Sequence, residues 1–202
     1  MLNLDYSKDY ILEDKQVKLS PLKMQHVESL IDISNESDLW TYFIEKGNGI
    51  ENLTKYVESA INNRKLNKEY PFVIFDKIKK EYVGTTRFYD YLNELKCIKL
   101  GHTWIGEKFR GTGLNKHCKF LLFEFAFEKL RLERVGFGVH IENRISIAAM
   151  RSVGCKKEGL LRNFIPSLDS KARADVMLLS ILKNEWLKKV KIELKNKLNA
   201  KT

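Results

Sequence analysis

The chain has 202 residues, of which 44% are hydrophobic and 31% are charged, and its formal net charge is +10. These proportions are typical of a globular protein and exclude a disordered chain. No stretch approaches the roughly 20 consecutive apolar residues that a membrane-spanning helix needs, so we expect no membrane partner. The length fits one domain, which we place over residues 1–202.

The net positive charge would attract polyanions such as nucleic acid, the ribosome or a phosphate-bearing cofactor. Lysines are spread along the chain and are densest from about residue 184, where pairs such as Glu185 and Lys189 favour the solvated face of a helix. We find no interleaved basic and aromatic residues typical of RNA-binding modules, so nucleic acid is not the expected partner. A non-catalytic basic module that binds RNA or the ribosome remains the alternative function.

The first half of the chain predicts two main helices followed by three strands. A short strand at Val17–Leu19, ended by Ser20 and Pro21, precedes them. The helices span His26–Ile33 and Asn52–Arg64, with a short helical turn at Asp38–Phe43 between them; the strands span Pro71–Phe75, Tyr82–Tyr89 and Cys97–Ile105. The links between these strands are short and polar, which indicates an antiparallel meander.

The second half alternates helices and strands. We predict helices at Lys116–Leu130, at Asn143–Val153 and from Asn184 onward, and strands at Arg134–His140, Leu160–Ile165 and Asp175–Leu182. A strand–helix–strand unit adds a parallel pair to an otherwise antiparallel sheet. The predicted fold is therefore an α/β fold with a mixed, mostly antiparallel central sheet and helices on both faces.

Between the third strand of the meander and the next helix lies Phe109-Arg110-Gly111-Thr112-Gly113-Leu114-Asn115. Its two glycines let the backbone approach a ligand closely, and the helix that follows points unpaired N–H groups at that ligand. These amides and the positive end of the helix dipole favour an anion, typically a phosphate. The loop matches neither the Walker pattern nor Gly-x-Gly-x-x-Gly, which argues against an ATPase and a dinucleotide oxidoreductase.

The order of these motifs resembles the GNAT superfamily of acetyl-CoA-dependent N-acetyltransferases, in its RimJ/RimL-like branch, from about Val17 to about Trp186. The segments that carry the resemblance are Val17–Leu22, Ser37–Trp40, Leu100–Ile105, Arg110–Asn115, Asn143–Ser146, Val153–Gly159 and Asp175–Trp186. Asn115 departs from the usual Gly or Ala and is shared with a subgroup that has Gly-Thr-x-x-Asn in this loop. We expect its amide to add a hydrogen bond near the helix start.

The resemblance implies that acetyl-CoA is the cosubstrate. Phe109 to Asn115 would form its binding loop, with the backbone amides of Arg110 to Leu114 holding the diphosphate. Trp104 and Ile105 would offer main-chain groups to the pantetheine and the acetyl carbonyl. Asn143 could bond the pantetheine arm, and Ser146 could reach the sulfur. Considered locally, the latter two are simply an N-cap and a first-turn hydroxyl.

The resemblance also implies direct attack of an amine on the thioester in a ternary complex. The acceptor would be a protein N-terminus or a small-molecule amine, and a homodimer is left open. Ser146, Asn143, His102 and Glu142 are the predicted catalytic residues, and the general base is unresolved between His102, Glu142 and Glu107, with His140 and His117 as weaker candidates. Lys116, Lys119 and Arg151 could meet the 3′-phosphate of CoA or face water.

Neither a metal nor an extracellular location is expected. The three cysteines, Cys97, Cys118 and Cys155, lie in apolar contexts without the paired spacing of a zinc site. The N-terminal residues lack a basic region followed by an apolar stretch, the usual form of a secretion signal. Reduced thiols in a cytoplasmic protein are therefore predicted.

Overall fold

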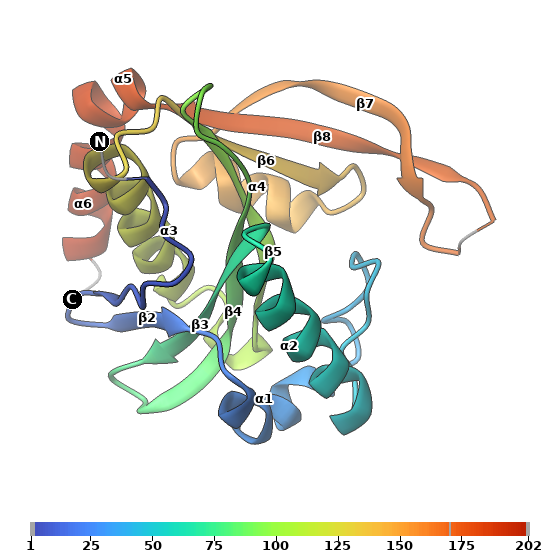
Figure 1. Cartoon of the computed structure of the whole chain (residues 1–202). Helices are drawn as coiled ribbons and strands as arrows, with labels where there is room; N and C mark the ends of the chain where they lie inside the picture. The colour runs from blue at the N-terminus through green and yellow to red at the C-terminus, as the bar shows by residue number, and fades with distance from the viewer. Residues whose placement is uncertain (1–2, 170, 201–202) are drawn as a thin grey trace.

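The computed structural model describes residues 3–169 and 171–200, which form one eight-stranded sheet in the order β1-β2-β3-β4-β5-β6-β8-β7 (Figure 1). Neighbouring strands are antiparallel, except that β5 and β6 are parallel. The strands are β1 (Leu12–Glu13), β2 (Val17–Pro21), β3 (Glu69–Asp76), β4 (Glu81–Leu92), β5 (Cys97–Ile105), β6 (Arg134–His140), β7 (Lys156–Pro166) and β8 (Arg173–Leu182). The predicted mixed, mostly antiparallel sheet is confirmed.

Helices cover both faces of this sheet. Contacts place α1 and α2 against β4 and β3, whereas α3 packs on β2 and against α6, on the opposite side in Figure 1. The helices are α1 (Val27–Ser34), α2 (Ile50–Lys65), α3 (Leu114–Glu124), α4 (Arg144–Ser152), α5 (Lys183–Glu185) and α6 (Lys191–Asn199). A π-helical turn at Phe125–Lys129 extends α3, and another at Trp186–Val190 joins α5 to α6. No helix in the described part of the chain is long and apolar enough to cross a membrane.

Two local predictions near the N-terminus were wrong. Ser20 and Pro21 continue β2, where Pro21 lies opposite Phe72 at the end of the strand and needs no N–H for the ladder. The predicted helical turn at Asp38–Phe43 is a series of non-helical turns. This segment buries Trp40, whose ring centroid lies 5.2 Å from that of Tyr56. Tertiary packing of the indole therefore overrides the local helix propensity of the segment.

The lysine-rich C-terminal segment is helical and packs against α3. Trp186 is fully buried, and its indole N–H donates to Glu128 at 2.8 Å. Lys191 donates to the same carboxylate at 2.7 Å and also pairs with Glu124 at 3.1 Å. The positive charge of Lys191 is therefore paired with carboxylates within the protein.

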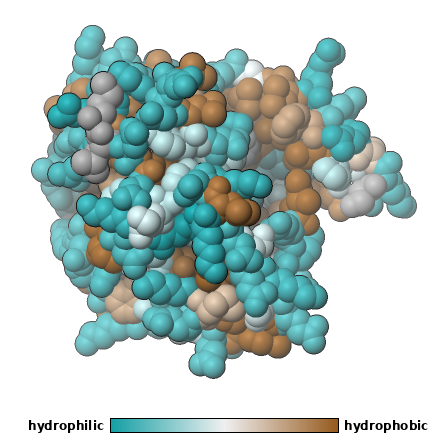
Figure 2. All heavy atoms as spheres, viewed as in Figure 1, coloured by the Kyte–Doolittle hydropathy of each residue, from teal (hydrophilic) through white to brown (hydrophobic). Residues whose placement is uncertain are grey.

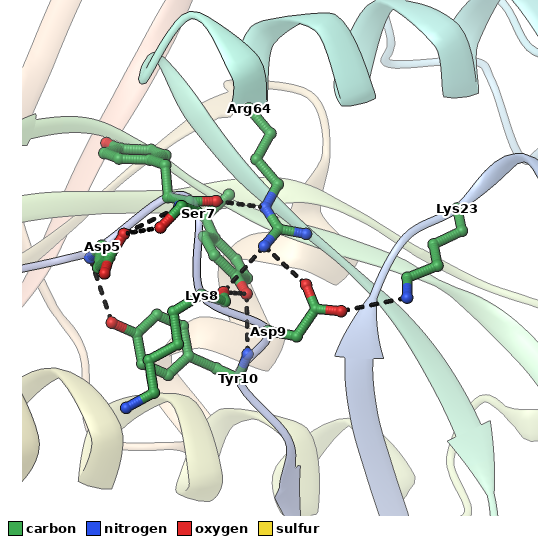
Figure 3. A network of polar contacts seen from close by, with 9 residues as sticks. Asp5, Ser7, Lys8, Asp9, Tyr10, Lys23 and Arg64 are labelled. Carbon is green, nitrogen blue, oxygen red and sulfur yellow. Dashed lines mark hydrogen bonds and ion pairs between the residues drawn. The ribbon is translucent and has the colours of Figure 1, made fainter.

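The N-terminal segment is tied to α2 by one arginine (Figure 3). Arg64 donates to the backbone oxygens of Tyr6 and Lys8 and to the Asp9 carboxylate, each at 2.8 Å. Lys23 lies 3.1 Å from the other oxygen of Asp9. This network holds the N-terminal segment against α2 and against Lys23, which follows β2.

The outer edge of the sheet is formed by β7, most of whose side chains are exposed. Together with β8 it forms a hairpin that projects from the body (Figure 1). Figure 2 shows apolar residues in brown among the side chains on this side of the molecule, and Leu160 and Phe164 are exposed there.

The strands β5 and β6 separate along most of their length. They pair at Cys97–Arg134, Ile98–Val135 and Lys99–Gly136, and at no later position in the described chain. Because β5 pairs with β4 almost to its end, only its β6-facing edge is left without a strand partner. We call this unpaired stretch, residues 100–105 of β5 opposite residues 137–140 of β6, the β5–β6 opening.

Candidate active site

A tight turn leads from the end of β5 into α3. Phe109 anchors it in the core, and the Thr112 hydroxyl donates to the Phe109 carbonyl at 2.7 Å. Gly111 and Gly113 have φ values of +76° and +99°, and Gly113 is the N-cap of α3. These left-handed conformations suit glycine and disfavour residues with a Cβ atom.

The backbone of this turn presents free donors. The N–H groups of Gly111, Thr112 and Gly113 donate no hydrogen bond within the described part of the chain. In the first turn of α3, the Asn115 N–H also donates no hydrogen bond within the described residues, whereas the Lys116 N–H donates to the Gly113 carbonyl at 2.8 Å. A Cβ atom built on Gly111 would meet no atom within 4 Å, so this face of the loop is open. These features fit the diphosphate of CoA.

Arg110 supports the loop through its main-chain N–H and its Nε atom. Its N–H donates to the Glu107 carbonyl at 2.9 Å, and its Nε donates to the Ile105 carbonyl at 3.0 Å. Of the amides from Arg110 to Leu114, that of Arg110 is therefore already used. The Leu114 N–H lies 3.4 Å from the Thr112 hydroxyl, a long hydrogen bond.

The hydrogen bond expected from Asn115 at the helix start is not formed by its side-chain oxygen. Gly113, not Asn115, occupies the N-cap, and the Oδ1 atom of Asn115 is buried without a hydrogen-bond partner. Asn115 lies in the first turn of α3, so its side chain is directed by the packing of the helix.

Trp104 and Ile105 end β5 beside the opening. Both side chains are buried, and the indole N–H of Trp104 donates to the Tyr56 hydroxyl at 3.3 Å. Their main chains pair with Thr85 and Gly84 of β4 on one side. The other edge of the strand has no strand partner in the described residues, and there the Ile105 carbonyl accepts from Arg110 Nε at 3.0 Å.

Asn143 and Ser146 begin α4, directly after β6. Asn143 is the N-cap, and its Oδ1 accepts from the Ser146 N–H at 3.0 Å. The local prediction of an N-cap is thus confirmed. The NH₂ group of Asn143 and the hydroxyl of Ser146 have no partner in the described residues, so both can still bind a ligand.

His102 lies on a β-bulge of β5. The pairing of β4 with β5 shifts between Thr85 and Arg87, and His102 has a φ of +48°. Its ring packs edge-on against Tyr89 at 5.5 Å between centroids. Burial, and then the nearby charge of Arg87, lower the pKa of His102 to about 4. At neutral pH the imidazole is therefore uncharged and a weak base.

The model of the "Acetyltransferase (GNAT) domain" family matches residues 16–156. The chain belongs to the GNAT acetyltransferase family. It is an acetyltransferase, and acetyl-CoA is its cosubstrate.

Known proteins agree with this assignment. The chain is 31% identical over 118 residues to "Uncharacterized N-acetyltransferase p20" of Bacillus licheniformis, a match that covers 57% of this chain and 63% of that relative. A GCN5-related N-acetyltransferase from Brucella melitensis has the same fold, with a TM-score of 0.85, 22% identity and coverage of 94% and 85% of the two chains. The self-immunity acetyltransferase MccE, solved with acetyl-CoA and AMP, is similar at a TM-score of 0.74 and 18% identity, over 84% of this chain and 93% of that one.

The other predicted bases of this GNAT acetyltransferase lie apart from His102. Glu142 is exposed beyond the end of β6, where its carbonyl accepts from the Tyr42 hydroxyl at 3.3 Å and its N–H donates to His140 at 3.2 Å. No hydrogen bond joins His102 to Glu142 in the described residues. Glu107 is also exposed, at the start of the turn before the loop.

The two histidines predicted as weaker candidates for the general base, His117 and His140, are both buried in contacts with other parts of the protein. His117 is buried on α3, where its Nδ1 lies 2.6 Å from the Asp14 carboxylate and ties the helix to the N-terminal segment. His140 is buried at the end of β6, with its ring 5.4 Å from that of Tyr42 and its Nε2 unpaired.

Lys119 does not face water or an exposed phosphate. The side chain is 1% exposed, and its Nζ donates to the Thr103 hydroxyl at 3.1 Å. Helical spacing could have predicted this burial. Lys119 lies four residues after Asn115 and three before the fully buried Leu122, so the three residues share one face of the helix.

Arg87 on β4 was not identified from the sequence. It is 1% exposed, donates to Glu69 at 2.8 Å and stacks at 4.3 Å over the Tyr56 ring. Its Nε and Nη2 atoms are buried without a partner. A single arginine in a strand carries no pattern that separates this arrangement from a solvated side chain.

The described residues contain no group of three or more His, Cys, Asp or Glu side chains that could hold a metal ion.

The low pKa of His102 gives a direct test. We expect the ring NMR signals of His102, assigned with His102→Gln, to keep the neutral-form shifts from about pH 8 down to about pH 5. The reason is that burial and Arg87 penalise the imidazolium. A titration midpoint near the ordinary value of 6.5 would show that the ring is solvated and not held in this way.

Proposed function

We propose that this protein transfers the acetyl group of acetyl-CoA to a primary amine of a protein N-terminus or a small molecule, in a ternary complex. We also place it in the RimJ/RimL-like branch, as a single-domain cytoplasmic enzyme. The observation that carries the proposal is the β5–β6 opening, which has free backbone donors at the α3 loop and two free side-chain groups at the start of α4.

The loop supports diphosphate binding in this proposal. The amides of Gly111, Thr112 and Gly113, with the dipole of α3, would hold the negative charge. Phe109 and Arg110 fix the loop, and Leu114 buries the first turn of the helix. Asn115 lies next in the same turn, with an unused oxygen.

The opening supports binding of the reactive end. The free edge of β5 at Trp104 and Ile105 would hydrogen-bond the pantetheine arm and the acetyl carbonyl. Across the opening, the Asn143 amide would hold the arm, and the Ser146 hydroxyl would lie at the sulfur. These donors would stabilise negative charge that develops as the thioester reacts.

The attacking amine must lose a proton, and two groups are candidates to receive it. His102 is neutral and lies on the bulge beside the opening, so it can accept a hydrogen bond, although its low pKa makes it a weak base. Glu142 is an exposed carboxylate at the end of β6. Both remain proposed catalytic residues.

A thiol-release screen tests the activity. We expect CoA release from acetyl-CoA to depend on an added amine or peptide, with mass spectrometry showing the product heavier by one acetyl group. The panel should contain peptides with free and blocked N-termini, together with small amines. Binding of RNA with no release for any amine would instead favour the basic-module alternative.

Gly111→Val tests the loop. We expect about a 100-fold loss of acetyl-CoA affinity in isothermal titration, because the new side chain fills the open face and removes hydrogen bonds worth about 1.5–3 kcal/mol each. Gly49→Val is the matched control, since Gly49 has a φ of +79°, is the N-cap of α2 and also has no atom within 4 Å of a built Cβ. Both variants carry similar backbone strain, so an equal affinity loss in the control would refute the loop assignment.

Ser146→Ala tests the thioester end. We expect turnover to fall about 10-fold to 100-fold, with little change in acetyl-CoA affinity, if the hydroxyl acts mainly on charge formed during transfer. Ser152→Ala on the same helix is the control, because that hydroxyl only donates to the Ala149 carbonyl at 2.8 Å. Unchanged turnover in Ser146→Ala would leave Ser146 with a structural role only.

A further inference from the structure

A single lysine lies where β5 and β6 separate. The Nζ atom of Lys119 is 3.1 Å from the Thr103 hydroxyl of β5 and 5.9 Å from the ring centroid of Phe137 on β6. Both partners come after the last paired residues of their strands, Lys99 and Gly136. The ammonium is therefore buried beside both strands, beyond the point where their pairing ends.

This ammonium has no carboxylate partner within the described residues. Its hydrogen-bond partner, Thr103, is a neutral hydroxyl that lies 2.8 Å from the Thr86 hydroxyl. The titratable groups that influence it are the thiols of Cys118 and Cys155, whose pKa values burial raises to about 12. Lys119 is therefore a buried cation surrounded by neutral groups, an arrangement that costs free energy unless a ligand compensates it.

Burial lowers the pKa of Lys119 to about 8, so most of the side chain remains charged at neutral pH. The ammonium has three N–H donors, and the protein supplies an acceptor for one of them. One helical turn earlier, the Oδ1 atom of Asn115 is also buried and unpartnered. Residues four apart share a face of a helix, so both unsatisfied groups belong to the same side of α3.

The free donors of Lys119 do not suit the diphosphate. Lys119 lies five residues after Leu114 in α3, or about 7.5 Å along the helix axis at about 1.5 Å per residue. The diphosphate belongs at the open turn before the helix, whereas Lys119 points between the strands. The group expected between the strands is the thioester end of the cosubstrate, an expectation that rests on the function proposed above.

We propose that the Lys119 ammonium stabilises the CoA thiolate released during acetyl transfer. In that step the amine nitrogen bonds to the acetyl carbon, and the carbon–sulfur bond breaks with its electron pair left on sulfur. The amine gives up one proton to the base or to water. The Lys119 N–H groups donate hydrogen bonds to the new thiolate, which takes a proton from solvent as CoA leaves.

The thiol pKa of bound CoA measures this interaction without turnover. Ultraviolet absorbance of the thiolate is followed against pH in the CoA complexes of wild type and Lys119→Met, with the desulfo-CoA complexes subtracted as background. We expect the thiol pKa in wild type to lie about one unit or more below that in Lys119→Met, since a cation nearby favours the anion. Lys119→Gln serves as a second neutral variant in case the first does not fold.

Thr103→Val is the matched control. It removes the hydrogen bond that the ammonium makes to β5 but leaves the charge in the opening, so the bound thiol pKa should stay low. If Lys119 only supports the fold, the neutral lysine variants will bind CoA with the wild-type thiol pKa, which overturns the proposal. If the wild type binds no CoA in this titration, the proposed function itself is refuted. The two results differ, because a failure of the Lys119 proposal alone leaves CoA binding intact.

Discussion

The separation of β5 from β6 is the constraint on which the rest of this structure depends. A sheet normally pairs each backbone donor and acceptor, and an unpaired edge in the interior costs free energy. Here the unpaired groups are confined to the β6-facing edge of β5, because the other edge pairs with β4 on both sides of the bulge at His102. A bulge bends its strand and increases the local twist, and this one follows the last residue of β5 that pairs with β6, Lys99. The β6-facing main-chain groups of β5 after Lys99 therefore have no strand partner in the described residues, and we propose that the cosubstrate bonds to them.

The protein carries further strain and charge at this opening, offset by packing elsewhere. The left-handed conformation of His102 costs about 1 kcal/mol. The lowering of the Lys119 pKa from 10.5 to about 8 corresponds to about 3 kcal/mol of lost stability at neutral pH. Because the folded pKa of this base is below the unfolded one, that loss is relieved as pH rises from about 8 to 10.5. On the other side of α3, the buried Trp186 and its bond to Glu128 supply compensating packing.

Sequence periodicity was sufficient for most of the fold, because helices and strands with one buried face repeat at 3.6 or 2 residues. The limits of β5 and β6 were predicted correctly, and so was their parallel pairing across a helix. The bulge at His102 could not be predicted, since it depends on the register with β4 and has no composition signal. The loop glycines were predictable from residue type, whereas the burial of Lys119 was missed because this lysine was predicted to meet the 3′-phosphate of CoA or to face water. Its place between Asn115 and Leu122 on the inner face of α3 was the available clue.

The acceptor side of the opening differs in chemistry from the cosubstrate side. Arg87 is close enough to His102 to lower its pKa; its Nη1 donates to Glu69, and its Nε and Nη2 atoms are buried without a hydrogen-bond partner. Burial is the largest cause of the low pKa of His102, and an amine buried beside it would lose solvation in the same way. An acceptor held near His102 would therefore be pushed toward its neutral, nucleophilic form before any base acts on it. In that arrangement a weak base is adequate, because burial already opposes the charged form of the amine.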